Sequence, residues 1–193
     1  MRKAIFIILG LIIISILLFA LITRFYLPFE CIKGDKSECI SRASELSDKN
    51  LLKRVCSKID RDGCITLLGM LHSKSKDDLI PYISDDYCNQ NISAFCAFSS
   101  IAYSTDGDSS NAQNFALKGC DLNEGVSCAI LAGIELDNEK DEDALKSSLK
   151  GCLLNSAAAC AIAGTILINK GEEREGMQFI DRCCELGGEE CCN

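Results

Sequence analysis

Cysteine is the residue type in this sequence with the richest possible chemistry, because the chain has 14 cysteines, one histidine and no tryptophan. Cysteine sulfurs can form disulfides, ligate zinc or exchange with other thiols. Each of the following pairs is separated by eight residues, and from Cys56 onward the pairs recur every 32 residues: Cys31/Cys39, Cys56/Cys64, Cys88/Cys96, Cys120/Cys128, Cys152/Cys160 and Cys184/Cys192. An even count at regular spacing is typical of a disulfide framework outside the reducing cytosol.

Four cysteines gather at the end of the chain, where Cys183 and Cys191 stand beside Cys184 and Cys192. Four thiolates could hold zinc, although structural zinc sites favour Cys-x2–4-Cys over adjacent cysteines. We interpret the four as two parallel disulfides that close the last turn, with Cys183/Cys191 as an additional pair. A redox-active or metal site here is the alternative.

Other residues that could do chemistry lack the partners that a reaction needs. His72 has serine and aspartate neighbours in sequence, but no nucleophile and orienting acid can be assigned to it. Ser147 and Lys150 fit the Ser-x-x-Lys spacing of serine β-lactamases without the other motifs of those enzymes. The acidic runs 137–143 and 172–175 lack the alternating pattern of a calcium loop. We therefore assign no catalytic, cofactor-binding or metal-binding residues, and expect no cofactor.

The cysteine spacing constrains the elements that carry it. In one continuous helix, residues eight apart are separated by about 12 Å, whereas a disulfide needs Cα atoms about 4.4–6.8 Å apart. The chain must therefore reverse between paired cysteines, and turn residues such as those in 121–125 and 186–188 favour that reversal. Each bridge is then expected to join the end of one helix to the start of the next.

The sequence between the cysteine pairs also repeats. Apolar blocks containing small residues follow the second cysteine of each pair, and polar stretches such as SKSKDD, STDGDSS and DNEKDED follow the apolar blocks. This alternation, with its period of 32, predicts an all-α fold, an α/α superhelical solenoid of disulfide-stapled helix pairs.

An uncharged segment precedes the repeats. Residues 4–23 form a run of 20 without charge, long enough to span a membrane as a helix. No small-x-small cleavage site follows it, so we interpret it as an uncleaved signal anchor, with cleavage and secretion as the alternative. The expected domains are 1–29, an N-terminal transmembrane helix with its juxtamembrane segment, and 30–193, the cysteine-rich repeats.

The part after the apolar segment is strongly acidic. Residues 25–193 contain 17 basic and 28 acidic residues. A surface with this excess of negative charge repels nucleic acid and anionic lipid, so neither is an expected partner for the repeat domain.

Two repeat units resemble a known family. The segments 118–133 (KGC-DLNEGVSC-AILAG) and 150–164 (KGC-LLNSAAAC-AIAG) resemble Sel-like repeats, relatives of tetratricopeptide repeats, and in particular the secreted cysteine-rich bacterial branch. The resemblance covers roughly residues 31–193. It departs from the family in a shorter period, and in a glycine-rich loop that is retained only at 106–108 and 170–171.

The resemblance implies a right-handed superhelix whose concave face binds a protein or peptide. Together with the apolar segment, it implies a scaffold in the bacterial inner membrane, single-pass through residues 4–23, with its C-terminal domain in the periplasm. Some cysteine-rich members of the family bind or slowly hydrolyse β-lactams, so a β-lactamase-type hydrolase is the alternative. We expect a binding protein rather than an enzyme.

Overall fold

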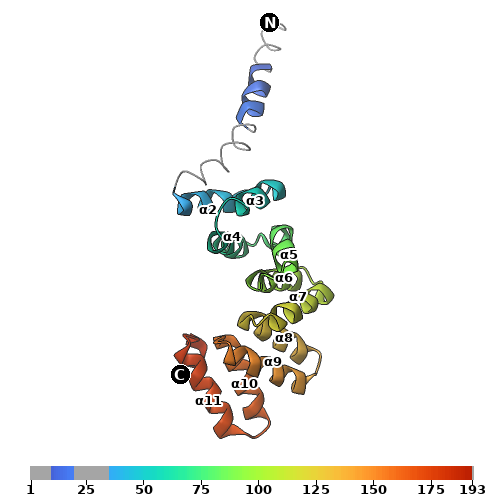
Figure 1. Cartoon of the computed structure of the whole chain (residues 1–193), viewed down its shortest axis with the longest axis vertical. Coiled ribbons are helices and arrows are strands. Elements are labelled where there is room, and N and C mark those ends of the chain that lie inside the picture. Colours follow the sequence, from blue (N-terminus) through green and yellow to red (C-terminus); the bar gives the residue numbers. More distant parts are fainter. Residues whose placement is uncertain (1–9, 20–34, 193) are drawn as a thin grey trace. The chain divides into compact units, whose positions relative to one another are not determined.

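The computed structural model describes residues 10–19 and 35–192, and all regular structure in these ranges is helical. This confirms the all-α fold for the described part of the chain. After the helical residues 10–19, the elements in Figure 1 are α2 (Lys36–Ser44), α3 (Lys49–Cys56), α4 (Arg61–Ser73), η1 (Asp77–Leu79), α5 (Pro81–Asn89), α6 (Ala94–Thr105), α7 (Ser109–Asp121), α8 (Gly125–Asp137), α9 (Asp141–Leu153), α10 (Ala157–Asn169), α11 (Glu173–Glu185) and η2 (Glu189–Cys191).

The predicted anchor is described only in its middle. Residues 10–19 are helical and carry large exposed apolar side chains, including Leu11, Ile14 and Leu17. Within the described ranges, no helix combines the length and apolar character that crossing a membrane requires. The remaining residues of segment 4–23, and the expected domain boundary between residues 29 and 30, lie outside the described residues.

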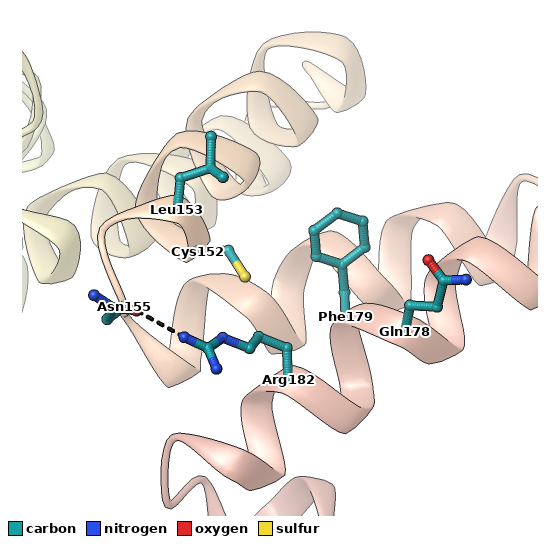
Figure 2. Close-up of a pocket in the computed structure, with 6 residues that line it drawn as sticks. All are labelled: Cys152, Leu153, Asn155, Gln178, Phe179 and Arg182. Atoms are coloured by element: carbon teal, nitrogen blue, oxygen red, sulfur yellow. Dashed lines mark hydrogen bonds between the residues drawn. The ribbon is translucent and has the colours of Figure 1, made fainter.

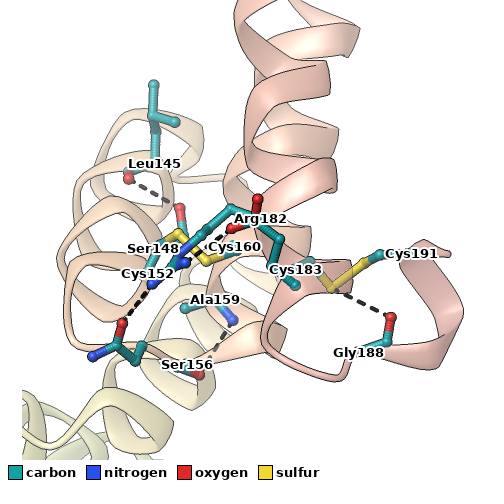
Figure 3. The surroundings of a disulfide bond; sticks show 12 residues. Leu145, Ser148, Cys152, Ser156, Ala159, Cys160, Arg182, Cys183, Gly188 and Cys191 are labelled. Carbon is teal, nitrogen blue, oxygen red and sulfur yellow. Dashed lines mark hydrogen bonds and ion pairs between the residues drawn. A yellow bond between two sulfur atoms is a disulfide. The ribbon is translucent and has the colours of Figure 1, made fainter.

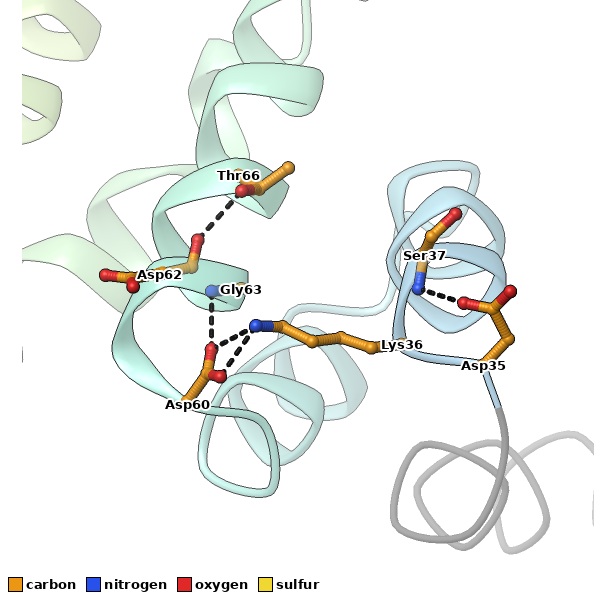
Figure 4. A network of polar contacts seen from close by, with 7 residues as sticks. All are labelled: Asp35, Lys36, Ser37, Asp60, Asp62, Gly63 and Thr66. Carbon is orange, nitrogen blue, oxygen red and sulfur yellow. Dashed lines mark hydrogen bonds and ion pairs between the residues drawn. The ribbon is translucent and has the colours of Figure 1, made fainter.

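The chain divides into two compact units, Met1–Leu71 and His72–Asn193. In the first unit, α2 and α4 are joined by an ion pair in which Lys36 Nζ lies 2.6 Å from an Asp60 carboxylate oxygen (Figure 4). Asp60 also caps α4 by accepting a hydrogen bond of 2.8 Å from the backbone nitrogen of Gly63. The hydrogen bond from Lys36 is the larger cause, and that from Gly63 the second, of an Asp60 pKa below its ordinary value.

The second unit consists of two layers of helices. Each helix from α5 to α11 packs against the next, and α8 also packs against α6 and α10. The even-numbered helices α6, α8 and α10 therefore form one layer. The odd-numbered helices α7, α9 and α11 form the other, and α7 and α9 each pack against the even helices on both sides. This is the α/α alternation that the period of 32 predicts.

The backbone repeats with the same period as the cysteines. Left-handed residues recur every 32 positions in the loops after the odd helices, at Asn91, Asn123, Asn155 and Gly187. A second series recurs every 32 positions before the odd helices, at Ser75, Gly107, Glu139 and Gly171. A residue at positive φ ends a helix and lets a later backbone N–H return to a free carbonyl, as Glu124 N does to Gly119 O at 3.0 Å. In both loops of each repeat, a residue at positive φ thus ends the preceding helix.

The paired cysteines lie at disulfide distance across the loops after the odd helices. The Cα–Cα separations are 5.0 Å for Cys56–Cys64, 4.9 Å for Cys88–Cys96, 4.5 Å for Cys120–Cys128 and 4.6 Å for Cys152–Cys160. Cys39 is also disulfide-bonded, and its expected partner Cys31 lies outside the described residues. The bridges join the end of one helix to the start of the next, because the chain reverses between the two cysteines.

A cation at one repeat position ties α7, α9 and α11 to the C-terminal end of the preceding odd helix or to the loop that follows that end. Lys118 Nζ donates to Asn89 Oδ1 at 3.1 Å, and Lys150 Nζ donates to the Cys120 carbonyl at 2.6 Å. Arg182, 32 residues after Lys150, donates through Nη2 to Asn155 Oδ1 at 2.9 Å. A positive charge near the C-terminal end of a helix also interacts favourably with the helix dipole. These contacts fix the spacing of successive repeats on the odd layer.

Candidate functional site

The four C-terminal cysteines form two parallel bridges, Cys183–Cys191 and Cys184–Cys192, with Cα–Cα separations of 5.9 and 5.0 Å. Cys183 stands where the two preceding repeats have Gly119 and Gly151, and it is fully buried. It packs against the Cys152–Cys160 bridge, as Figure 3 shows. The Cys183–Cys191 bridge, which has no counterpart in the two preceding repeats, therefore joins the buried cluster around Cys152 and Cys160.

The C-terminal bridges also bear on the metal alternative. In the described part of the chain, the ligand atoms of Cys183, Glu190 and Cys191 lie within 4.8 Å of one another. Zinc is held by thiolates, whereas these two sulfurs are bonded to each other. A metal or redox role would require this bridge to be reduced first.

The residues whose types could support catalysis, and to which the sequence assigned no catalytic role, make separate contacts. His72 Nδ1 lies 2.6 Å from Asp77 Oδ1, and the His72 side chain is half exposed. The Ser147 hydroxyl donates to the Glu135 carboxylate, whereas Lys150 donates to the Cys120 carbonyl. The Ser147-x-x-Lys150 spacing therefore gives no support for β-lactam hydrolysis, because its two members have different partners.

Two ionisable groups between the layers have shifted pKa values. Burial raises the pKa of Glu135, and the hydrogen bond from Ser147 partly opposes this shift. Burial, followed by the hydrogen bond to Asp85 at 2.8 Å, raises the pKa of Tyr103 to about 12. The Tyr103 ring stacks on Phe115 with 5.5 Å between ring centroids. Glu135 and Tyr103 lie on even helices and bond to residues of odd helices. Their contacts therefore help to pack the two layers together.

A small pocket of about 270 Å³ lies between α9 and α11 on the odd layer. Cys152, Leu153 and Phe179 supply its apolar wall, and Asn155, Gln178 and Arg182 supply polar groups (Figure 2). Arg182 is already bonded to Asn155 and to Glu185 Oε2. This pocket is below the usual size of small-molecule sites.

The solvent-facing side of the even layer has a different composition from the rest of the chain. Residues spaced i, i+4, i+7 and i+11 share one face of a helix. On α6, α8 and α10 these residues are exposed or partly exposed, and we call them the even face: Ala94, Phe98, Ile101, Thr105, Val126, Ile130, Gly133, Asp137, Ala158, Ile162, Thr165 and Asn169. The even face thus combines apolar and small residues with one charged residue, Asp137, in a chain of which 25% is charged.

The apolar side chains of the even face form a row. Phe98, Ile130 and Ile162 occupy the same position in three successive repeats, two residues after the second cysteine of each pair. The odd helices have a shorter series, because Leu117 and Leu149 share one repeat position that Asp181 occupies on α11. Scattered exposed apolar residues are normal, whereas a contiguous group marks an interaction surface.

Gly133 leaves open space in the middle of the even face. A Cβ added at Gly133 would meet no heavy atom within 4 Å, although the residue lies in the interior of α8. Glycine inside a helix is unfavourable relative to alanine, and packing within the described residues gives no reason for its presence. The opening allows another backbone to approach α8 closely.

Sequence reasoning identified the cysteines but assigned no partner-binding residues. The sequence did contain a pattern that marks the even face, because Phe98, Ile130 and Ile162 repeat with the same period as the cysteines. However, apolar residues at a repeating position are equally consistent with a buried core. Only the layer arrangement shows that this column lies partly exposed.

Comparisons with known proteins support the fold. No protein-family model and no curated protein matches the chain. Among solved structures, MamA from AMB-1 in crystal form C2221 is 16% identical with a TM-score of 0.51, over 86% of this chain and 99% of MamA. A second MamA structure is 11% identical with a TM-score of 0.48, over 85% of this chain and 95% of that one.

YrrB, described as a TPR protein with an unusual peptide-binding site, is 15% identical with a TM-score of 0.49, over 77% of this chain and 75% of YrrB. The described chain has a TPR-like helical repeat fold. This agrees with the tetratricopeptide relationship implied by the repeat units, while membership of the Sel-like cysteine-rich branch stays a prediction.

Proposed function

We propose that this chain is an extracytoplasmic repeat scaffold that binds a protein or peptide through the even face. The observation that carries the proposal is the row Phe98, Ile130 and Ile162, which remains partly exposed across three packed helices of a TPR-like fold. Apolar surface of this kind gains free energy when a partner removes it from water. The Sel-like resemblance implies that such a face is the concave one.

The proposed location rests on the cysteines and the apolar segment. All cysteines in the described residues are in disulfides, which persist in oxidising compartments. Residues 10–19 form an exposed helix that is apolar on all sides, which supports tethering through residues 4–23. We propose a single-pass protein of the bacterial inner membrane, with the repeats in the periplasm.

The location is tested by counting thiols in the full chain made in a host with an oxidising compartment. Alkylation without and then with reductant, followed by mass measurement, should reveal no free thiol before reduction. Free thiols at most of the repeat cysteines would contradict an extracytoplasmic location, because the bridges would then not form where the protein resides.

The binding function is tested by panning the full chain, in phosphatidylcholine nanodiscs, against a random peptide library. Val126 on the even face and Leu117 on α7 are 47% and 48% exposed, so Val126→Asp and Leu117→Asp are matched changes. Selected peptides should bind the Leu117→Asp variant like the wild type and lose about tenfold or more in affinity with Val126→Asp. Equal losses with both variants, or no enrichment of any peptide, would contradict the proposal.

A further inference from the structure

The charge around the even face is distributed unevenly. Successive even helices are separated by one odd helix that reverses the chain, so α6, α8 and α10 run in the same direction. Their C-terminal ends therefore lie along one edge of the even layer. The loops that follow them and the first residues of α7, α9 and α11 lie at the same edge. We call residues 105–109, 137–143 and 169–175 the acidic edge, because its acidic residues outnumber its basic residues ten to three.

The opposite edge of the even layer is nearly neutral. It consists of the disulfide loops, residues 88–94, 120–126 and 152–158, whose charged residues are Asp121 and Glu124. The Glu124 carboxylate caps α8 by accepting hydrogen bonds from the backbone nitrogens of Val126 and Ser127, as Asp108 on the acidic edge caps α7. The even face is thus an apolar surface bordered by an excess of seven acidic residues along one side and of two along the other.

We propose that the even face binds a cationic amphipathic segment of a partner protein. Apolar side chains of the segment would cover the row Phe98, Ile130 and Ile162, and its Lys or Arg side chains would lie along the acidic edge. This inference rests on the proposed function and adds the chemistry of the partner. The charge pattern carries it, because apolar contact alone does not discriminate between cationic, neutral and acidic segments.

The same pattern disfavours other occupants. An acidic segment would place like charges opposite residues such as Asp106, Asp137 and Asp141, and like-charge juxtaposition is unfavourable. An anionic membrane surface and nucleic acid are repelled for the same reason. A second copy of this chain also has a net charge of −8 and the same acidic edge. Contact between two even faces would therefore not pair the acidic edge with opposite charges.

The test measures the binding of three labelled helical peptides of about 18 residues, each with a leucine face. Their polar faces carry lysine, glutamine or glutamate. Binding to the full chain in phosphatidylcholine nanodiscs is followed by fluorescence anisotropy at about 50 and about 300 mM salt, with empty nanodiscs subtracted. Sedimentation velocity of the chain without peptide reports any self-association.

Two triple variants make the test specific for the acidic edge. Asp137→Asn, Glu139→Gln and Asp141→Asn together neutralise the edge at the middle repeat. The control variant Asp121→Asn, Asp181→Asn and Glu189→Gln changes the net charge equally at exposed positions away from that edge. Circular dichroism verifies that both variants retain the helical fold.

The lysine peptide should bind about tenfold more tightly than the glutamine peptide at low salt, and the preference should shrink at high salt. The edge variant should reduce the preference to about threefold or less, while the control variant leaves it unchanged. Equal binding of the lysine and glutamine peptides, or equal losses with both triple variants, would overturn the charge inference.

The two proposals fail in distinguishable ways. If the glutamine peptide binds as tightly as the lysine peptide and both lose affinity with Val126→Asp, the scaffold function stands and the cationic partner does not. If no peptide binds, both proposals fail. Self-association that disappears with Val126→Asp would identify a second copy as the occupant and overturn the cationic segment.

Discussion

Replacing Gly133 and Gly151 by alanine gives opposite expected effects on stability, because the two helix-interior glycines have different surroundings. Alanine is about 0.8–1.0 kcal/mol more favourable than glycine inside a helix. At Gly133 nothing lies within 4 Å of an added Cβ, so neither a packing gain nor a clash modifies this value. Gly133→Ala should therefore stabilise the protein by about 1 kcal/mol.

Gly151→Ala gains the same helix propensity, but its added Cβ would lie too close to neighbouring atoms. Its Cβ would lie 2.6 Å from Ala159 Cβ and 3.0 Å from both Cys128 Cβ and the Gly125 carbonyl oxygen. Favourable carbon contacts are about 3.5–4.0 Å, and overpacking a core costs about 1–3 kcal/mol. The net expectation is destabilisation by about 1–2 kcal/mol, because short side chains and backbone cannot move aside as a flexible side-chain end can.

The measurement is thermal and guanidinium unfolding of the full chain and both variants, followed by far-ultraviolet circular dichroism. For a chain of this length, about 1 kcal/mol corresponds to a change in Tm of about 2–4 °C. Tm should rise for Gly133→Ala and fall for Gly151→Ala. A fall for Gly133→Ala, or shifts of the same sign in both variants, would refute the assignment of Gly133 to an open face and Gly151 to a helix contact.

Three further changes test the repeat loops, the contact between layers and the bridges. Glu139 holds a left-handed backbone at φ 59°, so Glu139→Gly should relieve local strain and stabilise by roughly 0.5–1 kcal/mol in guanidinium unfolding. Burial raises the pKa of Glu135, so the charged form of its side chain destabilises the fold. Glu135→Gln should therefore raise Tm at pH 7. This gain in Tm should disappear as pH falls below the unfolded pKa of about 4.3, where the carboxyl is protonated in both states. A Tm gain that persists at pH 3 would contradict this. The double change Cys120→Ala and Cys128→Ala opens a nine-residue loop and should lower the unfolding free energy by about 2–3 kcal/mol; an unchanged guanidinium midpoint and slope would refute a stabilising role for this bridge.

The sequence by itself determined the helical class, the period and the positions of the helix pairs. These properties are local, because the eight-residue cysteine spacing requires a chain reversal at disulfide distance and the polar stretches end the helices. The left-handed residues Asn91, Asn123 and Asn155 carry the same 32-residue period in the backbone. The pairing of helices across each bridge follows from this local geometry.

Only the tertiary structure decided which helix face is covered and which is open. Gly133 and Gly151 both lie inside helices, and nothing in the local sequence shows that one meets solvent while the other touches Ala159. Similarly, Phe98, Ile130 and Ile162 repeat like core residues, yet each stays partly exposed where α8 packs between α6 and α10, although Ile130 also packs against a buried cluster. Burial depends on contacts between helices far apart in the chain, and the periodicity of one helix specifies its apolar side but not the neighbour that covers it.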